Sequence, residues 1–98
     1  MLILRTLARN GPLHGYGIAQ FIRQTTSHVL QVEEGSLYPA LQRLLLKGWV
    51  EAEWRTSETN RRARFYSLTA AGRAQLQAEV AEFSRVIKAI EQVLGEAV

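Results

Sequence analysis

The sequence predicts a mainly α-helical fold with one small β-hairpin: a winged helix-turn-helix domain at residues 1–69, followed by a C-terminal dimerisation helix at residues 70–98. Three observations support this prediction. Apolar residues recur at helical spacing in three short segments before residue 48. Two segments rich in strand formers then flank a polar turn, and a long apolar stripe with heptad spacing follows them.

Two helices are expected at the start of the chain. The first is short and apolar, and "NGPL" at 10–13 ends it because glycine and proline both interrupt helices. The second covers residues 14–26 and buries its apolar face through Ile18, Ala19, Phe21 and Ile22. The following residues, 27–35, are predicted to form an extended link with room for a very short strand.

The third helix is expected from Leu37 to Lys47, with Gly48 as its C-terminal stop. Ser36 is its predicted N-cap, which would place Pro39 in the first turn, where the missing N–H costs no helical hydrogen bond. The acidic pair "EE" at 33–34 would complement the positive end of the helix.

A β-hairpin is predicted next. Alternating residues in 49–57 and strand formers in 63–68 flank the polar turn "SETNRR" at 57–62. The alternation places Trp54 on the inward face, so Trp54 and the preceding Trp49 are both expected in the core. Asn60 suits the turn because asparagine tolerates the left-handed conformation.

Thr69 is the predicted cap of the last helix, whose apolar residues are spaced alternately by four and three positions. This stripe could fold back on its own domain or pair with a second subunit. We favour pairing between two subunits, because the stripe is long and the preceding domain is already compact. The residues expected to dimerise are Leu76, Val80, Phe83, Ile87, Ile90 and Leu94, and Ala97 continues the stripe.

The composition of the chain excludes several kinds of site and suggests one kind of partner. The 98 residues include no cysteine and only two histidines, so neither disulfides nor a convincing metal site is expected. No apolar run reaches the ~20 residues that span a membrane, and a cytoplasmic protein is expected. Residues 1–69 carry nine Lys or Arg against five Glu, a balance of +4, and residues 70–98 carry −1, which together give the net +3. A basic cluster at Arg61, Arg62 and Arg64 suggests a polyanionic partner.

Three stretches resemble the PadR family of bacterial transcriptional regulators over essentially the whole chain: "GPLHGYGIAQFI", "EEGSLYPALQRLLLKGWVEAEW" and "TNRRARFYSLTAAGR". The resemblance implies a winged-helix domain that binds double-stranded operator DNA, a homodimer formed through the C-terminal helix, and repression of a nearby gene. It also implies that a small aromatic effector can release the DNA; otherwise no cofactor is expected. Such proteins usually have a few more residues ahead of Leu2, so a longer natural start is expected.

The predicted DNA contacts combine this resemblance with residue chemistry. Tyr38 is similar to the family tyrosine that meets a phosphate at the start of the recognition helix, and Tyr16 is expected near the DNA backbone. Gln42 and Arg43 lie on the helix face that would enter the major groove, where they suit adenine and guanine. Further contacts to phosphate, sugar, a thymine methyl or the minor groove are expected from Ser36, Pro39, Lys47, Arg61, Arg62 and Arg64.

Other interpretations remain open at this stage. His14 is more typical of a helix cap or a packing residue than of a functional group. An effector would fit between the first and last helices at the subunit interface, near Phe83. A winged-helix protein-interaction module without DNA binding is the alternative function. An enzyme is not expected, because no constellation of reacting side chains is present.

Overall fold

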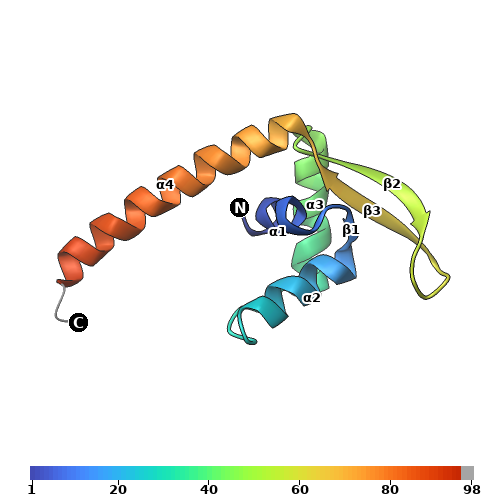
Figure 1. Cartoon of the computed structure of the whole chain (residues 1–98), viewed down its shortest axis with the longest axis horizontal. Helices are drawn as coiled ribbons and strands as arrows, with labels where there is room; N and C mark the ends of the chain where they lie inside the picture. Colours follow the sequence, from blue (N-terminus) through green and yellow to red (C-terminus); the bar gives the residue numbers. More distant parts are fainter. Residues whose placement is uncertain (96–98) are drawn as a thin grey trace.

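The computed structural model describes residues 1–95, and Ala97 of the apolar stripe lies outside this range. Its elements follow in the order α1 (Leu2–Asn10), β1 (Leu13–His14), α2 (Gly15–Thr25), α3 (Glu34–Leu46), β2 (Val50–Thr56), β3 (Arg62–Leu68) and α4 (Ala70–Leu94). The three short helices form the body of the domain. The β2–β3 hairpin projects from one side of this body, and α4 runs outward from the other (Figure 1).

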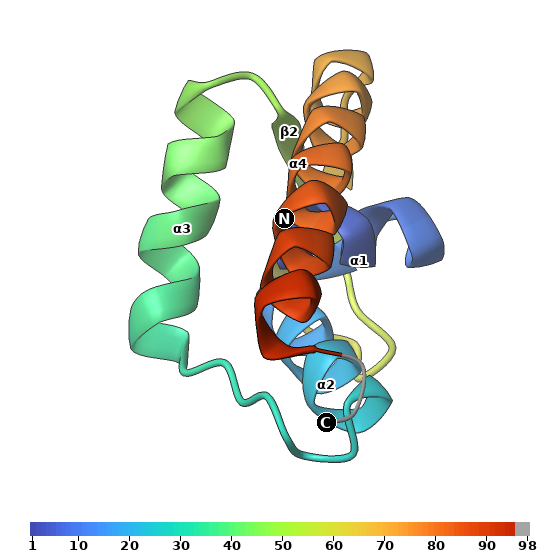
Figure 2. The same cartoon turned by 90° about the vertical axis from the view of Figure 1, so that its left-hand side faces the viewer.

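The core lies where α1, α2 and α3 meet the inner half of the hairpin and the start of α4. Its buried side chains come from every element except β1: Leu4, Leu7, Ile18, Ile22, Leu37, Leu41, Val50, Tyr66 and Leu76. The described residues thus confirm a mainly helical winged fold. Seen after a 90° turn, α3 stands along one side of the domain, which leaves its outer surface uncovered (Figure 2).

The sheet has three strands rather than the two of the predicted hairpin. Strand β3 lies in the centre, antiparallel to β2 on one side and to β1 on the other. The link between α2 and α3 was predicted to have room for a strand, which was wrong. It turns through Ser27 and His28, both with positive φ, and the third strand is formed instead by Leu13 and His14.

Helix α3 begins earlier than predicted. Glu33 is the N-cap residue, without a side-chain hydrogen bond, and Leu37 N–H donates to the Glu33 carbonyl at 2.9 Å. Ser36 is therefore not the cap, which corrects the sequence-based prediction. Pro39 lies in the second turn rather than the first, so the helix forgoes one hydrogen bond, to the carbonyl of the exposed Gly35.

The start of α4 is fixed to the end of α3. Thr69 caps α4 as predicted: its hydroxyl accepts from Gly72 N–H at 3.0 Å and donates to the Gly48 carbonyl at 2.7 Å. Gly72 has no room for a side chain, because a Cβ there would lie 2.0 Å from the Trp49 carbonyl oxygen. These contacts set the direction in which α4 leaves the domain.

Candidate nucleic-acid interface

Helix α3 presents one face to the core and the opposite face to solvent. Leu37 and Leu41 are buried. Gln42 and Arg43 are exposed, as predicted from their spacing, and so is Pro39. Leu46, which was not among the predicted contacts, shares this surface and is 80% exposed. The outer face of α3 therefore combines one amide, one guanidinium and apolar groups, all of which can contact base edges in a major groove.

Tyr38 connects α3 to the start of α2. A Cβ added to Gly15 would lie 2.9 Å from both Cε1 and the hydroxyl oxygen of Tyr38, so the phenol ring rests directly on the Gly15 backbone. The ring is still 47% exposed. Its hydroxyl thus lies beside the N-terminal end of α2, where the helix dipole favours an anion. Tyr16, in the same turn of α2, is also exposed.

His14 caps α2. Its Nδ1 accepts a hydrogen bond from Gly17 N–H at 3.0 Å, and its ring meets Phe65 edge-on with centroids 5.2 Å apart. The interpretation of His14 as a cap and packing residue is thereby confirmed. The cap fixes the α2 start beside β3, which brings Tyr16 near the hairpin.

The three arginines predicted to contact DNA, Arg61, Arg62 and Arg64, are exposed on the hairpin. Arg61 follows the tight turn at Asn60, which has the predicted positive φ of 61°, and its carbonyl accepts from Ser57 N–H at 2.7 Å. The guanidinium of Arg62 lies 5.6 Å from the ring centroid of Trp54. That of Arg64 lies 6.0 Å from the ring of Tyr66.

Trp54 is not a core residue, contrary to the prediction from alternation. It is 59% exposed, whereas Val50 on the same face of β2 is buried. The reason is that the hairpin extends past the helices that cover its inner half, so both faces of its outer half meet solvent. Trp49, in contrast, packs partly buried against the core as predicted.

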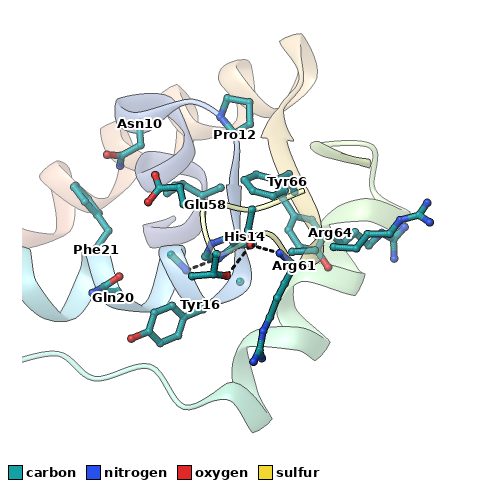
Figure 3. Close-up of a pocket in the computed structure, with 18 of the residues that line it drawn as sticks. Asn10, Pro12, His14, Tyr16, Gln20, Phe21, Glu58, Arg61, Arg64 and Tyr66 are labelled. Carbon is teal, nitrogen blue, oxygen red and sulfur yellow. Dashed lines mark hydrogen bonds between the residues drawn. The ribbon is translucent and has the colours of Figure 1, made fainter. Parts of the chain in front are cut away.

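A groove of about 1070 Å³ brings several of these residues together. It runs between the α2 start, Tyr38 and the hairpin, and Figure 3 shows Arg61 and Arg64 extending outward from the hairpin beside it. Among the predicted contact residues its lining contains Tyr16, Tyr38, Arg61, Arg62 and Arg64. The groove is therefore basic and aromatic, a combination that suits a phosphate backbone.

The remaining predicted contacts lie outside the groove. Gln42, Arg43 and Pro39 are on the outer face of α3. Lys47 is at the C-terminal end of α3, where its ammonium lies 4.7 Å from the centre of the Trp49 ring. Ser36 is exposed in the first turn of α3. Tyr38 is the residue of α3 that lines the groove, so the groove borders the N-terminal part of this helix.

Comparison with known proteins identifies the family. The model of the transcriptional regulator PadR-like family matches residues 3–78. The chain belongs to this family. This is a family of transcriptional regulators and not a family of enzymes.

Two sequence relatives match most of this PadR-like chain. A 37.1 kDa protein in transposon TN4556 of Streptomyces fradiae is 43% identical over 86 residues, and protein X of Lysinibacillus sphaericus is 32% identical over 78 residues. The matches cover 88% and 80% of this chain. The chain spans 23% of the Streptomyces protein and 72% of the Lysinibacillus protein.

Solved structures share the fold. A transcriptional regulator from Clostridium thermocellum superposes with a TM-score of 0.86 at 28% identity, over 96% of this chain and 90% of that one. A PadR family regulator from Clostridium difficile gives 0.82 at 28% identity, over 96% and 95% of the two chains. Bacillus subtilis PadR, solved in complex with operator DNA, gives 0.69 at 25% identity, over 81% of this chain and 44% of that one.

A second surface of the PadR-like chain lies on α4. The apolar stripe is exposed from Val80 onward, and it includes Phe83, Ile87, Ile90 and Leu94, with Val86 and Val93 beside them. Leu76 was assigned to the same stripe, but it is only 5% exposed and packs in the core of its own chain. The free stripe therefore begins one turn later than predicted.

Residues 1–95 hold neither a membrane-spanning helix nor a cluster of metal ligands. No helix in this range is long and apolar enough to cross a membrane. No group of three or more His, Asp or Glu side chains within it could hold a metal ion.

Proposed function

We propose that this chain is a homodimeric DNA-binding repressor. The proposal rests on the groove in which Tyr38, resting on Gly15, meets the exposed arginines of the β2–β3 hairpin, together with the exposed polar face of α3. In a winged helix-turn-helix bound to DNA, the recognition helix enters the major groove. The neighbouring polar and basic side chains then lie close to the phosphate backbone and the minor groove. The operator complex of the Bacillus subtilis relative supports DNA as the partner.

Helix α3 enters the major groove in this proposal. Gln42 pairs with adenine, Arg43 with guanine or phosphate, and Pro39 contacts a thymine methyl or a sugar. Lys47 and Ser36, at the two ends of the helix, bind phosphates. These assignments follow from side-chain chemistry and from the exposure of all five residues.

The basic groove binds the sugar–phosphate backbone next to α3. The hydroxyl groups of Tyr38 and Tyr16 donate hydrogen bonds to phosphate oxygens at the positive end of α2. Arg61, Arg62 and Arg64 bind phosphates or enter the minor groove. The three guanidinium groups outweigh the single carboxylate that lines the groove, Glu58.

Two chains pair through α4. An exposed apolar patch of this length marks an interaction surface, and heptad spacing suits a second helix of the same kind. Pairing would place two α3 helices on one face of DNA, with half-sites about 34 Å apart. Repression follows when such an operator overlaps a promoter. The aromatic effector stays a prediction; the exposed Leu2 and Phe83 belong to the surface that would hold it.

The test is a titration against a labelled duplex from the region upstream of the gene, followed by fluorescence anisotropy at several salt concentrations. We expect the logarithm of affinity to fall linearly with the logarithm of salt concentration. Arg61→Ala/Arg62→Ala should make this dependence shallower, reducing the magnitude of the slope by up to about 0.9 for each lost phosphate contact. Tyr38→Phe should weaken binding roughly fivefold, because it removes one hydrogen bond worth about 1 kcal/mol.

The matched control is Arg85→Ala/Lys88→Ala, which removes the same charge from an exposed part of α4 remote from the groove. The affinity of this control variant should depend on salt concentration as steeply as that of the parent. Binding that is weak, indifferent to sequence and unchanged by the groove variants would contradict the proposal. That outcome would favour the alternative function, a protein-interaction module that uses the α4 stripe.

A further inference from the structure

The outer half of the hairpin has two different faces. Register places Trp54 opposite Arg64 and Thr56 opposite Arg62, so these four side chains share one face. Glu53 opposite Phe65 and Arg55 opposite Ala63 share the other. The two faces carry arginine–aromatic stacks of similar geometry but differ in charge.

On the Trp54 face, arginines and aromatic rings alternate outward from the core. Tyr66 is buried, and the guanidinium of Arg64 lies over its ring. Trp54 lies directly across from Arg64 in the sheet. The guanidinium carbon of Arg62 lies 5.6 Å from the centroid of the Trp54 ring. The row thus connects the rigid core to an arginine near the tip of the hairpin.

On the opposite face the charge is already neutralised. The guanidinium of Arg55 lies 5.6 Å from the Phe65 ring centroid, but it also forms an ion pair and a hydrogen bond with Glu53. Among the described residues, Arg62 and Arg64 have no acidic partner within 4.0 Å. Only the Trp54 face therefore carries guanidinium groups that remain available for an anion.

We propose that Trp54 is a positioning residue for DNA binding, and that the hairpin presents its Trp54 face to the sugar–phosphate backbone. The inference rests on the proposed function and deepens it. The indole holds the Arg62 guanidinium in one orientation, ready to bind a phosphate. Trp54, Arg62, Arg64 and Tyr38 all line the same groove, so an arginine held by this ring lies next to the backbone path set by Tyr38.

The physical reason is side-chain entropy. A free arginine loses much rotamer freedom when it binds, and a partner that restricts it beforehand reduces that loss. Tryptophan is the best aromatic partner for a guanidinium. Because Trp54 is more than half exposed, burial in the core does not explain a large apolar residue here.

The first experiment compares the parent dimer with Trp54→Thr, Trp54→Phe, Arg62→Ala and Trp54→Thr/Arg62→Ala in the salt-dependent DNA titration. Threonine favours strands and removes the ring, whereas phenylalanine keeps a ring. We expect Trp54→Thr to bind DNA about two- to fivefold more weakly, because it loses an exposed cation–π contact. Its affinity should also depend less steeply on salt concentration. Trp54→Phe should restore most of the affinity, and the double variant should bind as Arg62→Ala does.

The matched control is Arg55→Ala, which removes one positive charge from the opposite face of the same hairpin. It should cost less affinity than Arg62→Ala. A second measurement needs no DNA: NMR resonances of the Arg62 side chain should be shifted upfield by the indole ring in the free protein and lose this shift in Trp54→Thr. Circular dichroism should show that all variants are folded.

Three outcomes would overturn the inference. Trp54→Thr could weaken binding as much in the Arg62→Ala background as in the parent, which would make Trp54 a direct contact. Arg55→Ala could lose as much DNA affinity as Arg62→Ala, which would show that the Trp54 face is not the one that meets DNA. An absent ring shift would remove the stacking itself. In each case steep salt dependence of the parent would leave the proposed function standing, whereas a parent that does not bind DNA would overturn both.

Discussion

The close approach of Gly72 to the Trp49 backbone makes Gly72→Ala an informative substitution. The new Cβ would lie 2.0 Å from the Trp49 carbonyl oxygen, and real Cβ atoms do not come closer than about 3.0 Å, so the α4 backbone must move by about 1 Å. A clash with a backbone atom cannot be relieved by a rotamer change. Overpacking of this kind costs about 3 kcal/mol, at the upper end of the usual range.

Alanine also favours the helix by about 1 kcal/mol relative to glycine. The net expectation is a loss of about 2 kcal/mol in the free energy of unfolding, or roughly 8–16 °C in Tm for a domain of this size. The assay is thermal and urea unfolding followed by circular dichroism, with all variants at one protein concentration because dimerisation would affect Tm.

Gly35→Ala is the matched control, since Gly35 is also helical but has open space around its Cβ position. It should be neutral or more stable by up to about 1 kcal/mol. If Gly72→Ala melts at or above the temperature of the parent, then the junction between α3 and α4 is not rigid, and the reasoning about how α4 is directed is refuted.

Three further predictions concern α4. Thr69→Ala removes the N-cap and should lower the free energy of unfolding by about 1–2 kcal/mol, measured by urea titration against Ser84→Ala, the loss of an exposed hydroxyl on α4. Ile87→Glu places a charge in the exposed stripe and should convert the proposed dimer to a monomer in sedimentation equilibrium; an unchanged mass would contradict pairing through α4. Hydrogen bonds from Gln75 and from the N-terminal ammonium group lower the pKa of Glu79, so its contribution to stability is present above its ordinary pKa of 4.5 and lost as pH falls through the lowered value. Glu79→Gln should reduce this acid dependence in unfolding measured from pH 7 to pH 3, and an identical pH profile would show that the contact is absent.

Features set by nearest neighbours in the chain were predictable from sequence. Thr69 and His14 cap helices through hydrogen bonds to N–H groups only three residues away. Asn60 takes the left-handed conformation because its own side chain tolerates it. The apolar periodicity of each helix also depends only on residues close together in the chain, so the order of the four helices and of the two hairpin strands could be predicted without any knowledge of packing.

The start of α3 and strand β1 were not predictable in this way. Glu33 caps α3 without its side chain, so no residue type marks the position, and the more typical cap Ser36 lies inside the helix. Two residues are too few to show strand alternation, and Leu13 and His14 become a strand only because β3 lies beside them.

The surfaces that carry the proposed function depended most on the tertiary structure. Alternation correctly placed Trp54 on the same face as the buried Val50. It could not show that the helices covering this face do not reach as far as Trp54. Heptad spacing placed Leu76 and Val80 in one stripe, although the domain buries the first and leaves the second exposed. The sequence by itself determined the four helices and the two hairpin strands, apart from the exact start of α3, and which way their residues face. Only the tertiary structure decided which of those faces are covered, because burial depends on how far neighbouring elements reach and not on the spacing of residues within one element.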